Sequence, residues 1–153
     1  MAPAMAQPPS SVAEPIGEIS YLYALGEGMA AATVIGAHPV RVERLKGNAA
    51  QDSAIEKRYF AAHGLRVVAF KFPQADFYTV TSVEVTTSAA LRQINHAWPQ
   101  MNRAAIIANF GTPVSQTATS IRYKGSAEIC SDFMDIGLKD GKMASITWTF
   151  CAD

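Results

Sequence analysis

The chain has 153 residues, and its 13 basic and 13 acidic side chains leave no formal net charge at neutral pH. This balance gives no electrostatic footprint for nucleic acid or for an anionic membrane, and no apolar run approaches the ~20 residues that a membrane-spanning helix needs. Hydrophobic residues make up 49% of the chain and charged residues 17%. These values argue against a disordered chain and predict one folded domain with a sizeable core.

The first residues read MAPAMAQPPSS. Ala4 and Ala6 occupy positions −3 and −1 of an A-x-A cleavage site, which would release a chain that starts at Gln7. We therefore expect residues 1–15 to be the remainder of a signal peptide and a disordered leader, followed by a single domain over residues 16–153. The alternative is an Ala/Pro-rich leader without targeting meaning.

The first part of this domain predicts two helices after a buried segment. Residues 18–25 (EISYLYAL) predict a strand or another buried segment, and residues 27–39 (EGMAAATVIGAHP) predict a short helix that stops before the proline. Residues 54–63 predict a helix, because Ser53 and Glu56 have capping-box spacing and a glycine follows the last residue. His63 would then lie at a helix C-terminus, where its charge is favoured.

The second part alternates strands and helices. Residues 65–72 and 78–87 are rich in β-branched and aromatic residues and are separated by PQAD, which predicts a hairpin. A helix is predicted over residues 88–98 from a Ser88 cap, and another over residues 100–111, with Pro99 in its first turn and Gly111 as its terminator. TSIRY, residues 119–123, predicts a strand. The sequence therefore predicts an α+β fold with an antiparallel sheet, in which helices precede a hairpin twice.

A final hairpin is predicted by Asp140-Gly141, which favours a two-residue type I′ loop. In the simplest register the numbers of facing residues sum to 281, so that Cys130 faces Cys151 at a closely spaced pair suited to a disulfide. A bulge between them would break this match, and two buried free thiols are the alternative. A disulfide and a cleavage site together predict the bacterial periplasm or the cell exterior.

Three segments carry a resemblance to a known fold: RAAIIANFGTP, SIRY and DFMDIGLKDGKMASITW. Together, over residues 101–150, they resemble the repeat unit of the beta-lactamase-inhibitor-protein-like fold, which small outer-membrane assembly lipoproteins also use. The resemblance implies two helix-plus-sheet units, with halves at 16–87 and 88–153. It also implies one curved antiparallel sheet with helices on its convex side, and a non-enzymatic binding role.

The same register assigns two faces to the final hairpin. Phe133, Ile146 and Trp148 would form the apolar face that packs under helices. The opposite face would be solvated, buried by another element or used by a partner, and Met-rich faces suit adaptable binding. Together with a tyrosine on the neighbouring strand, it supplies the predicted partner-binding residues Met134, Ile136, Met143, Ser145, Thr147 and Tyr123.

No catalytic constellation is visible in the sequence. His38, His63 and His96 have no metal-ligand spacing, and neither cysteine has the context of a nucleophile. We therefore predict no catalytic residue, metal or cofactor. The leading hypothesis is a secreted protein-binding domain of the inhibitor or immunity type, acting on an envelope enzyme. The alternatives are a structural accessory of envelope assembly and a small hydrolase or ligand carrier.

Overall fold

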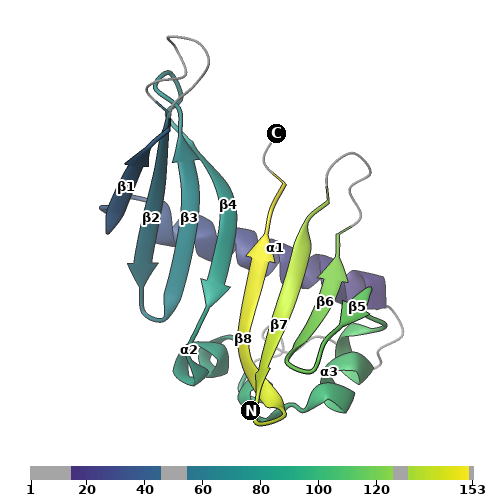
Figure 1. Ribbon diagram of the computed structural model, residues 1–153. Coiled ribbons are helices and arrows are strands. Elements are labelled where there is room, and N and C mark those ends of the chain that lie inside the picture. Colours follow the sequence, from purple (N-terminus) through teal and green to yellow (C-terminus); the bar gives the residue numbers. More distant parts are fainter. Residues whose placement is uncertain (1–14, 46–54, 126–130, 152–153) are drawn as a thin grey trace.

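Eight antiparallel strands form one sheet in the computed structural model, which describes residues 15–45, 55–125 and 131–151. The strand order is β1-β2-β3-β4-β8-β7-β6-β5 (Figure 1). The predicted α+β class with an antiparallel sheet is therefore confirmed. None of the helices in the described ranges is long and apolar enough to cross a membrane.

The sheet consists of two four-stranded meanders, each preceded by helix. Helix α1 (Pro15–Val34) comes before β1 (Arg41–Arg44), β2 (Glu56–Ala62), β3 (Leu65–Lys71) and β4 (Tyr78–Val85). Helix α2 (Ser88–Ile94), the 3-10 turn η3 (Trp98–Gln100) and α3 (Arg103–Phe110) come before β5 (Ser115–Gln116), β6 (Ser120–Lys124), β7 (Phe133–Lys139) and β8 (Lys142–Thr149). The meanders join where β4 pairs with β8.

Helix α1 runs across the strands of both meanders on one face of the sheet (Figure 1). Its buried stripe repeats every four residues, at Leu22, Gly26, Ala30 and Val34, which is the spacing of one helix face. The stripe is made mostly of small residues, so the helix axis can lie close to the sheet. At Gly26 a Cβ atom would lie only 2.6 Å from the ring of Trp148.

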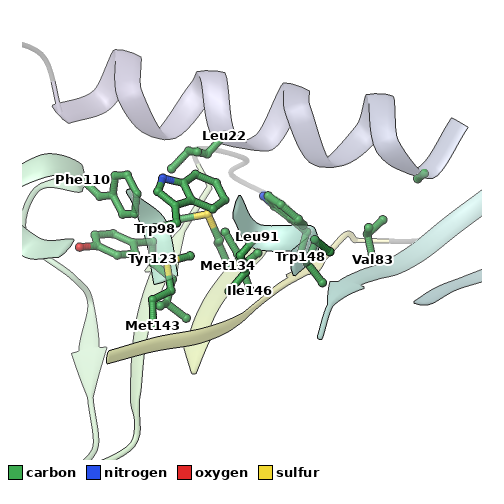
Figure 2. Packing of buried hydrophobic residues seen from close by; sticks show 14 of the residues in the cluster. Leu22, Val83, Leu91, Trp98, Phe110, Tyr123, Met134, Met143, Ile146 and Trp148 are labelled. Atoms are coloured by element: carbon green, nitrogen blue, oxygen red, sulfur yellow. The ribbon is translucent and has the colours of Figure 1, made fainter. Parts of the chain in front are cut away.

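The core lies between this helix and the sheet. Val83 and Val85 of β4 face Trp148 and Ile146 of β8 across the join between the meanders, and all four side chains are fully buried. Further along, Trp98, Phe110 and Tyr123 form a chain of edge-to-face aromatic contacts (Figure 2). We call the face of the sheet that meets the helices the inner face, and the opposite one the outer face.

Residues 18–25 are helical, so the predicted strand there is wrong. They join the predicted 27–39 helix into one continuous α1, which ends at Val34 and is followed by Gly36 with a φ of 69°. Tyr21 and Tyr23 made the segment look β-like, but Leu22 lies four residues before Gly26 on the buried stripe. Tertiary packing of that stripe outweighs the weak intrinsic preference of the aromatic residues.

The predicted helix over 54–63 is also wrong, because Glu56–Ala62 form strand β2 between β1 and β3. His63 and Gly64 have φ values of 50° and 83°, and they form the two-residue turn between β2 and β3. The glycine therefore serves a tight hairpin turn, which needs positive φ just as a helix terminus does. His63 lies in this turn and not at a helix end.

The other predicted elements are present with changed ends, but Pro99 was wrongly placed in the first turn of the second helix, because it lies in the separate turn η3 between α2 and α3. The runs at 65–72 and 78–87 form β3 and β4, and the predicted strand at 119–123 is β6. Thr87, one residue before the expected cap, accepts a hydrogen bond from the backbone N–H of Ala90. Helix α3 begins after Asn102, whose side chain caps it, and ends at Gly111 with a φ of 97°. Strands β1 and β5 were not predicted.

Candidate functional site

The predicted turn of the last hairpin is confirmed, since Asp140 and Gly141 have φ values of 54° and 78°. Its predicted register is wrong beyond the first pairs. The register shifts between Gly137 and Leu138, so from there to the end away from the turn the numbers of facing residues sum to 282 and not to 281. Because neighbouring residues of a strand point to opposite faces, this shift of one residue changes which residues of β7 share a face with Ile146 and Trp148 of β8.

Four of the predicted partner-binding residues lie in the core. Met134 pairs with Trp148 and Ile136 pairs with Ile146; both are 0% exposed, and Tyr123 and Met143 are 2% exposed. Because these side chains pack under the helices, the predicted face is corrected: they share the inner face with Trp148 and offer no surface to a partner.

Ser145 and Thr147 lie on the outer face, as the odd-numbered residues of β8 that alternate with buried Ile146 and Trp148. Phe133 was expected in the core, but it lies on the outer face opposite Thr149. Of the residues predicted for partner binding, the structure therefore brings only Ser145 and Thr147 together on an accessible surface.

The predicted disulfide involves Cys130, which lies outside the described residues, as do Ala4 and Ala6 of the predicted cleavage site. The 281 register on which the cysteine pairing was argued does not hold beyond the bulge. The backbone N–H of Cys151 donates a 2.8 Å hydrogen bond to the carboxylate of Asp132. The disulfide stays a prediction.

The outer face spans both meanders and carries a different chemistry from the inner face. No helix or strand in the described parts of the chain lies over it (Figure 1). Hydroxyl residues run along its centre, on β4 and β8, and aromatic and charged residues flank them. Following the register from β1 to β6, the residues of this face are Arg41, Glu43, Lys57, Tyr59, Ala61, Arg66, Val68, Phe70, Thr79, Ser82, Glu84, Ser145, Thr147, Thr149, Phe133, Asp135, Gly137, Ser120, Arg122 and Lys124.

Two aromatic rings on this face lie under basic side chains. The guanidinium of Arg41 lies 3.9 Å from the centre of the Tyr59 ring, and the ammonium of Lys57 lies 5.5 Å from it. On the other meander, Arg122 lies 4.5 Å from the centre of the Phe133 ring. Such contacts contribute ~0.5–1 kcal/mol at exposed sites. They hold flat apolar surfaces in place beside positive charge.

Ion pairs fix two of the basic side chains. Arg122 donates to both carboxylate oxygens of Asp135, at 2.7 and 3.0 Å, and this hydrogen bonding raises the pKa of the guanidinium. Arg66 donates to Glu84 at 2.6 and 3.1 Å. Because side chains held in this way lose less conformational entropy when a partner binds, the face is partly preorganised.

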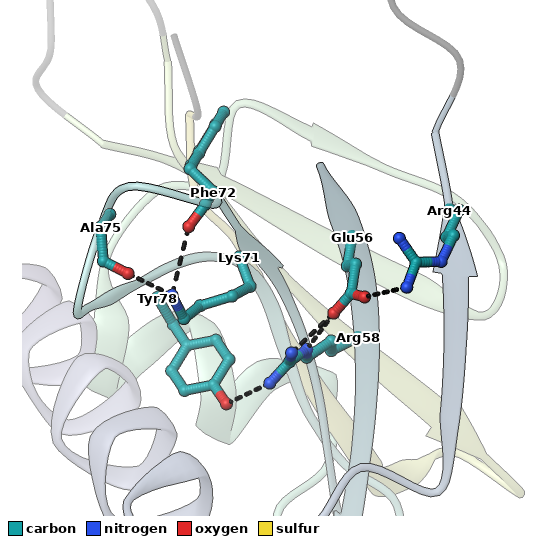
Figure 3. A network of polar contacts seen from close by, with 7 residues as sticks. All are labelled: Arg44, Glu56, Arg58, Lys71, Phe72, Ala75 and Tyr78. Atoms are coloured by element: carbon teal, nitrogen blue, oxygen red, sulfur yellow. Dashed lines mark hydrogen bonds and ion pairs between the residues drawn. The ribbon is translucent and has the colours of Figure 1, made fainter. Parts of the chain in front are cut away.

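A second polar cluster lies on the inner face, at the edge formed by β1 and β2 (Figure 3). Glu56 accepts hydrogen bonds from Arg58 at 2.6 and 2.9 Å and forms a 3.3 Å ion pair with Arg44. Hydrogen bonding from Arg58 lowers the pKa of Glu56. Arg58 also donates to the Tyr78 hydroxyl at 2.8 Å. The cluster ties strands β1, β2 and β4 together.

The described residues offer no group of three or more His, Cys, Asp or Glu that could hold a metal ion. His38, His63 and His96 are exposed and far apart in the topology. No protein-family model, curated protein or solved structure matches this chain. The candidate site is therefore defined by geometry alone, as the outer face of the sheet.

Proposed function

We propose that the protein is a secreted, non-catalytic protein-binding domain that uses the outer face of its sheet to bind and block an enzyme of the bacterial envelope. The observation that carries this proposal is a face built from both meanders that no described element covers. A solvated face needs only polar side chains, whereas this one also carries Tyr59, Phe70 and Phe133. Aromatic residues and arginine are enriched at protein interfaces.

The chemistry of the face specifies the kind of partner. Basic side chains outnumber acidic ones on it, although the whole chain has no net charge. A partner with an acidic surface would gain from this complementarity in association rate and in orientation. The central hydroxyl residues, which include Ser145 and Thr147, can donate or accept hydrogen bonds to a partner backbone. We propose that Tyr59 and Phe133 are the two apolar anchors.

The resemblance of residues 101–150 to the beta-lactamase-inhibitor-protein-like repeat supports the inhibitor or immunity type within this proposal. The order of helix and four-stranded meander, present twice, supports a two-unit architecture. Export to the periplasm belongs to the same proposal, and the cleavage site at Ala4 and Ala6 supports it. A structural accessory of envelope assembly would use the same face, but it would copurify with an outer-membrane complex.

The test is an affinity purification from a bacterial envelope extract, followed by measurement with the purified partner. We expect a one-to-one complex that inhibits the partner's activity in proportion to the amount of complex. Thr149→Glu places a longer, negatively charged side chain at the centre of the outer face, where it both crowds the interface and repels an acidic partner, and should weaken binding at least tenfold. Ala32→Glu makes the same change of charge at an exposed position of α1 and serves as the matched control.

Truncating an anchor tests the face independently. Phe133→Ala should also weaken binding by tenfold or more, since hot-spot truncations cost ~2 kcal/mol or more. Thermal melting of each variant shows whether the fold is retained. Equal partner affinity for the wild type, Thr149→Glu and Phe133→Ala would refute the use of this face, and turnover of a substrate by the isolated chain would refute a non-catalytic role.

A further inference from the structure

A cavity of about 640 Å³ lies on the inner side of the sheet, away from the outer face. Its walls are the C-terminal half of α1, the residues that lead into and begin β4, and the chain that follows β8. The volume falls within the range of small-molecule sites, ~300–1,000 Å³. The lining residues are Glu27, Ala30, Ala31, Val34, Ile35, Gly36, Asp76, Phe77, Tyr78, Val80, Asp132, Phe150 and Cys151.

The floor of this cavity is apolar. Ala30 and Val34 are buried on α1, and Val80 and Phe150 pack against the same core. Alanine on the helix leaves room there that a longer side chain would fill. A hydrocarbon chain or an aromatic ring placed in this space would lose contact with water on the side that faces the floor, and removing apolar surface from water is the main driving force for binding an apolar group.

The mouth of the cavity exposes two large apolar side chains. Ile35 is 76% exposed at the end of α1, and Phe77 is 66% exposed just before β4. Single exposed apolar residues are ordinary on a protein surface. These two line the same cavity, one from the end of α1 and the other from the residues before β4, and exposed apolar surface that gathers at a hollow is typical of a binding site. They can extend the apolar contact of a ligand beyond the floor.

The charged residues known to line the cavity share one sign. Among the described lining residues, Glu27, Asp76 and Asp132 are charged and none is basic. Two basic side chains that contact residues in or beside the cavity wall have partners of their own. The ammonium of Lys71 donates to the carbonyl oxygens of Phe72 and Ala75, and Arg58 is held by Glu56 at 2.6 Å. The cavity therefore combines an apolar interior with an acidic rim.

From this combination we propose that the cavity binds a small amphipathic cation, in which a short hydrocarbon chain or an aromatic ring carries a protonated amine. The apolar part occupies the floor between α1 and β4, and the ammonium group stays at the rim near the carboxylates. An anionic amphiphile of the same length is disfavoured by repulsion from these carboxylates. The site is independent of the outer face.

A matched series of eight-carbon ligands tests the proposal, because octylamine, octanol and octanoate share one chain and differ in charge. Binding to the full chain is followed by NMR titration below the micellar concentration. We expect saturable shifts at the amides of Ala31 and Phe77. Octylammonium should bind ~3- to 10-fold more tightly than octanol, because each exposed ion pair contributes only a small factor to the affinity. Octanoate should bind most weakly of the three. The preference should shrink at high salt.

Two substitutions on α1 locate the binding. Ala31→Phe places a ring in the cavity and should weaken octylammonium binding at least tenfold. Ala32→Phe, at an exposed position that does not line the cavity, should leave binding unchanged. Equal affinity for the three ligands, or equal affinity of both variants for octylammonium, would overturn the proposal. Concentration-dependent shifts of the same amides without ligand would identify a second copy of the chain as the occupant and would overturn it too.

Discussion

The close approach of α1 to the sheet depends on Gly26, and replacing this residue with alanine tests the packing directly. A Cβ atom built there lies 2.6, 2.8 and 2.9 Å from three atoms of the Trp148 ring, where ordinary contact begins at 3.4 Å. The ring cannot give way easily, because Trp148 is 0% exposed and pairs with Val83 and Met134 on the neighbouring strands. The helix or the ring must therefore shift.

Two opposing terms set the size of the effect. Alanine in the middle of a helix is favoured over glycine by ~1 kcal/mol, whereas forcing an extra methyl group into a packed core costs ~1–3 kcal/mol. We expect the overpacking term to dominate and Gly26→Ala to lower the free energy of unfolding by ~1–2 kcal/mol. At ~2–4 °C per kcal/mol for a chain of this size, the melting temperature should fall by several degrees.

Gly28→Ala is the matched control, because it lies on the same helix and a Cβ atom there has nothing within 4 Å. This variant should gain the helix-propensity term and melt ~2–4 °C higher than the wild type. Circular dichroism melts and urea titrations of both variants measure the difference. If Gly26→Ala raised stability as much as Gly28→Ala, the close contact with Trp148 would be refuted.

A double-mutant cycle separates the clash from other effects. Trp148→Ala removes the three ring atoms that crowd a Cβ atom at position 26, and it breaks no hydrogen bond, because the indole N–H has no hydrogen-bond partner among the described residues. In this background Gly26→Ala should be nearly neutral or stabilising. Coupling between residues in contact is ~0.5–3 kcal/mol, and additive costs would mean that the two residues do not interact.

Three other changes test the core, the polar cluster and the cysteines. Trp148→Ala should cost ~3–5 kcal/mol because it empties a fully buried site, whereas Thr147→Ala on the outer face should be mild, and equal losses of melting temperature would contradict the assignment of faces. The lowered pKa of Glu56 predicts that its contribution to stability is fully present above the ordinary glutamate pKa of ~4.3 and is lost as the pH falls through the lower pKa of the folded state; the stability difference between wild type and Glu56→Gln should therefore shrink as the pH is lowered from neutral into the acid range. Alkylation without reductant should add no mass at Cys130 and Cys151 in periplasmically expressed protein, and two alkylated thiols would contradict the disulfide.

The last hairpin separates what the sequence could determine from what it could not. Asp140 and Gly141 specify their turn locally, because only a few residue types tolerate positive φ, so the turn was predictable. The bulge beside Gly137 has a weaker signal, because an isolated glycine inside a strand is only suggestive of one, and it sets which face of β7 lies beside Trp148. The alternation within β7 does indicate its buried face, because apolar Met134 and Ile136 alternate with Asp135 and Gly137. The simple register without a bulge pointed to the opposite face.

The two errors at the start of the chain have the same physical origin. Residues 18–25 and 56–62 have mixed intrinsic preferences, and their states are decided by distant partners: the buried stripe of α1 meets Trp148, and β2 lies between β1 and β3. Gly64 was correctly read as a residue with positive φ, but a helix end and a hairpin turn both use that conformation. Local residues thus determined the α+β class and most turns. The faces of the strands, the outer face and the cavity were decided by tertiary pairing, because they depend on contacts between residues far apart in the chain.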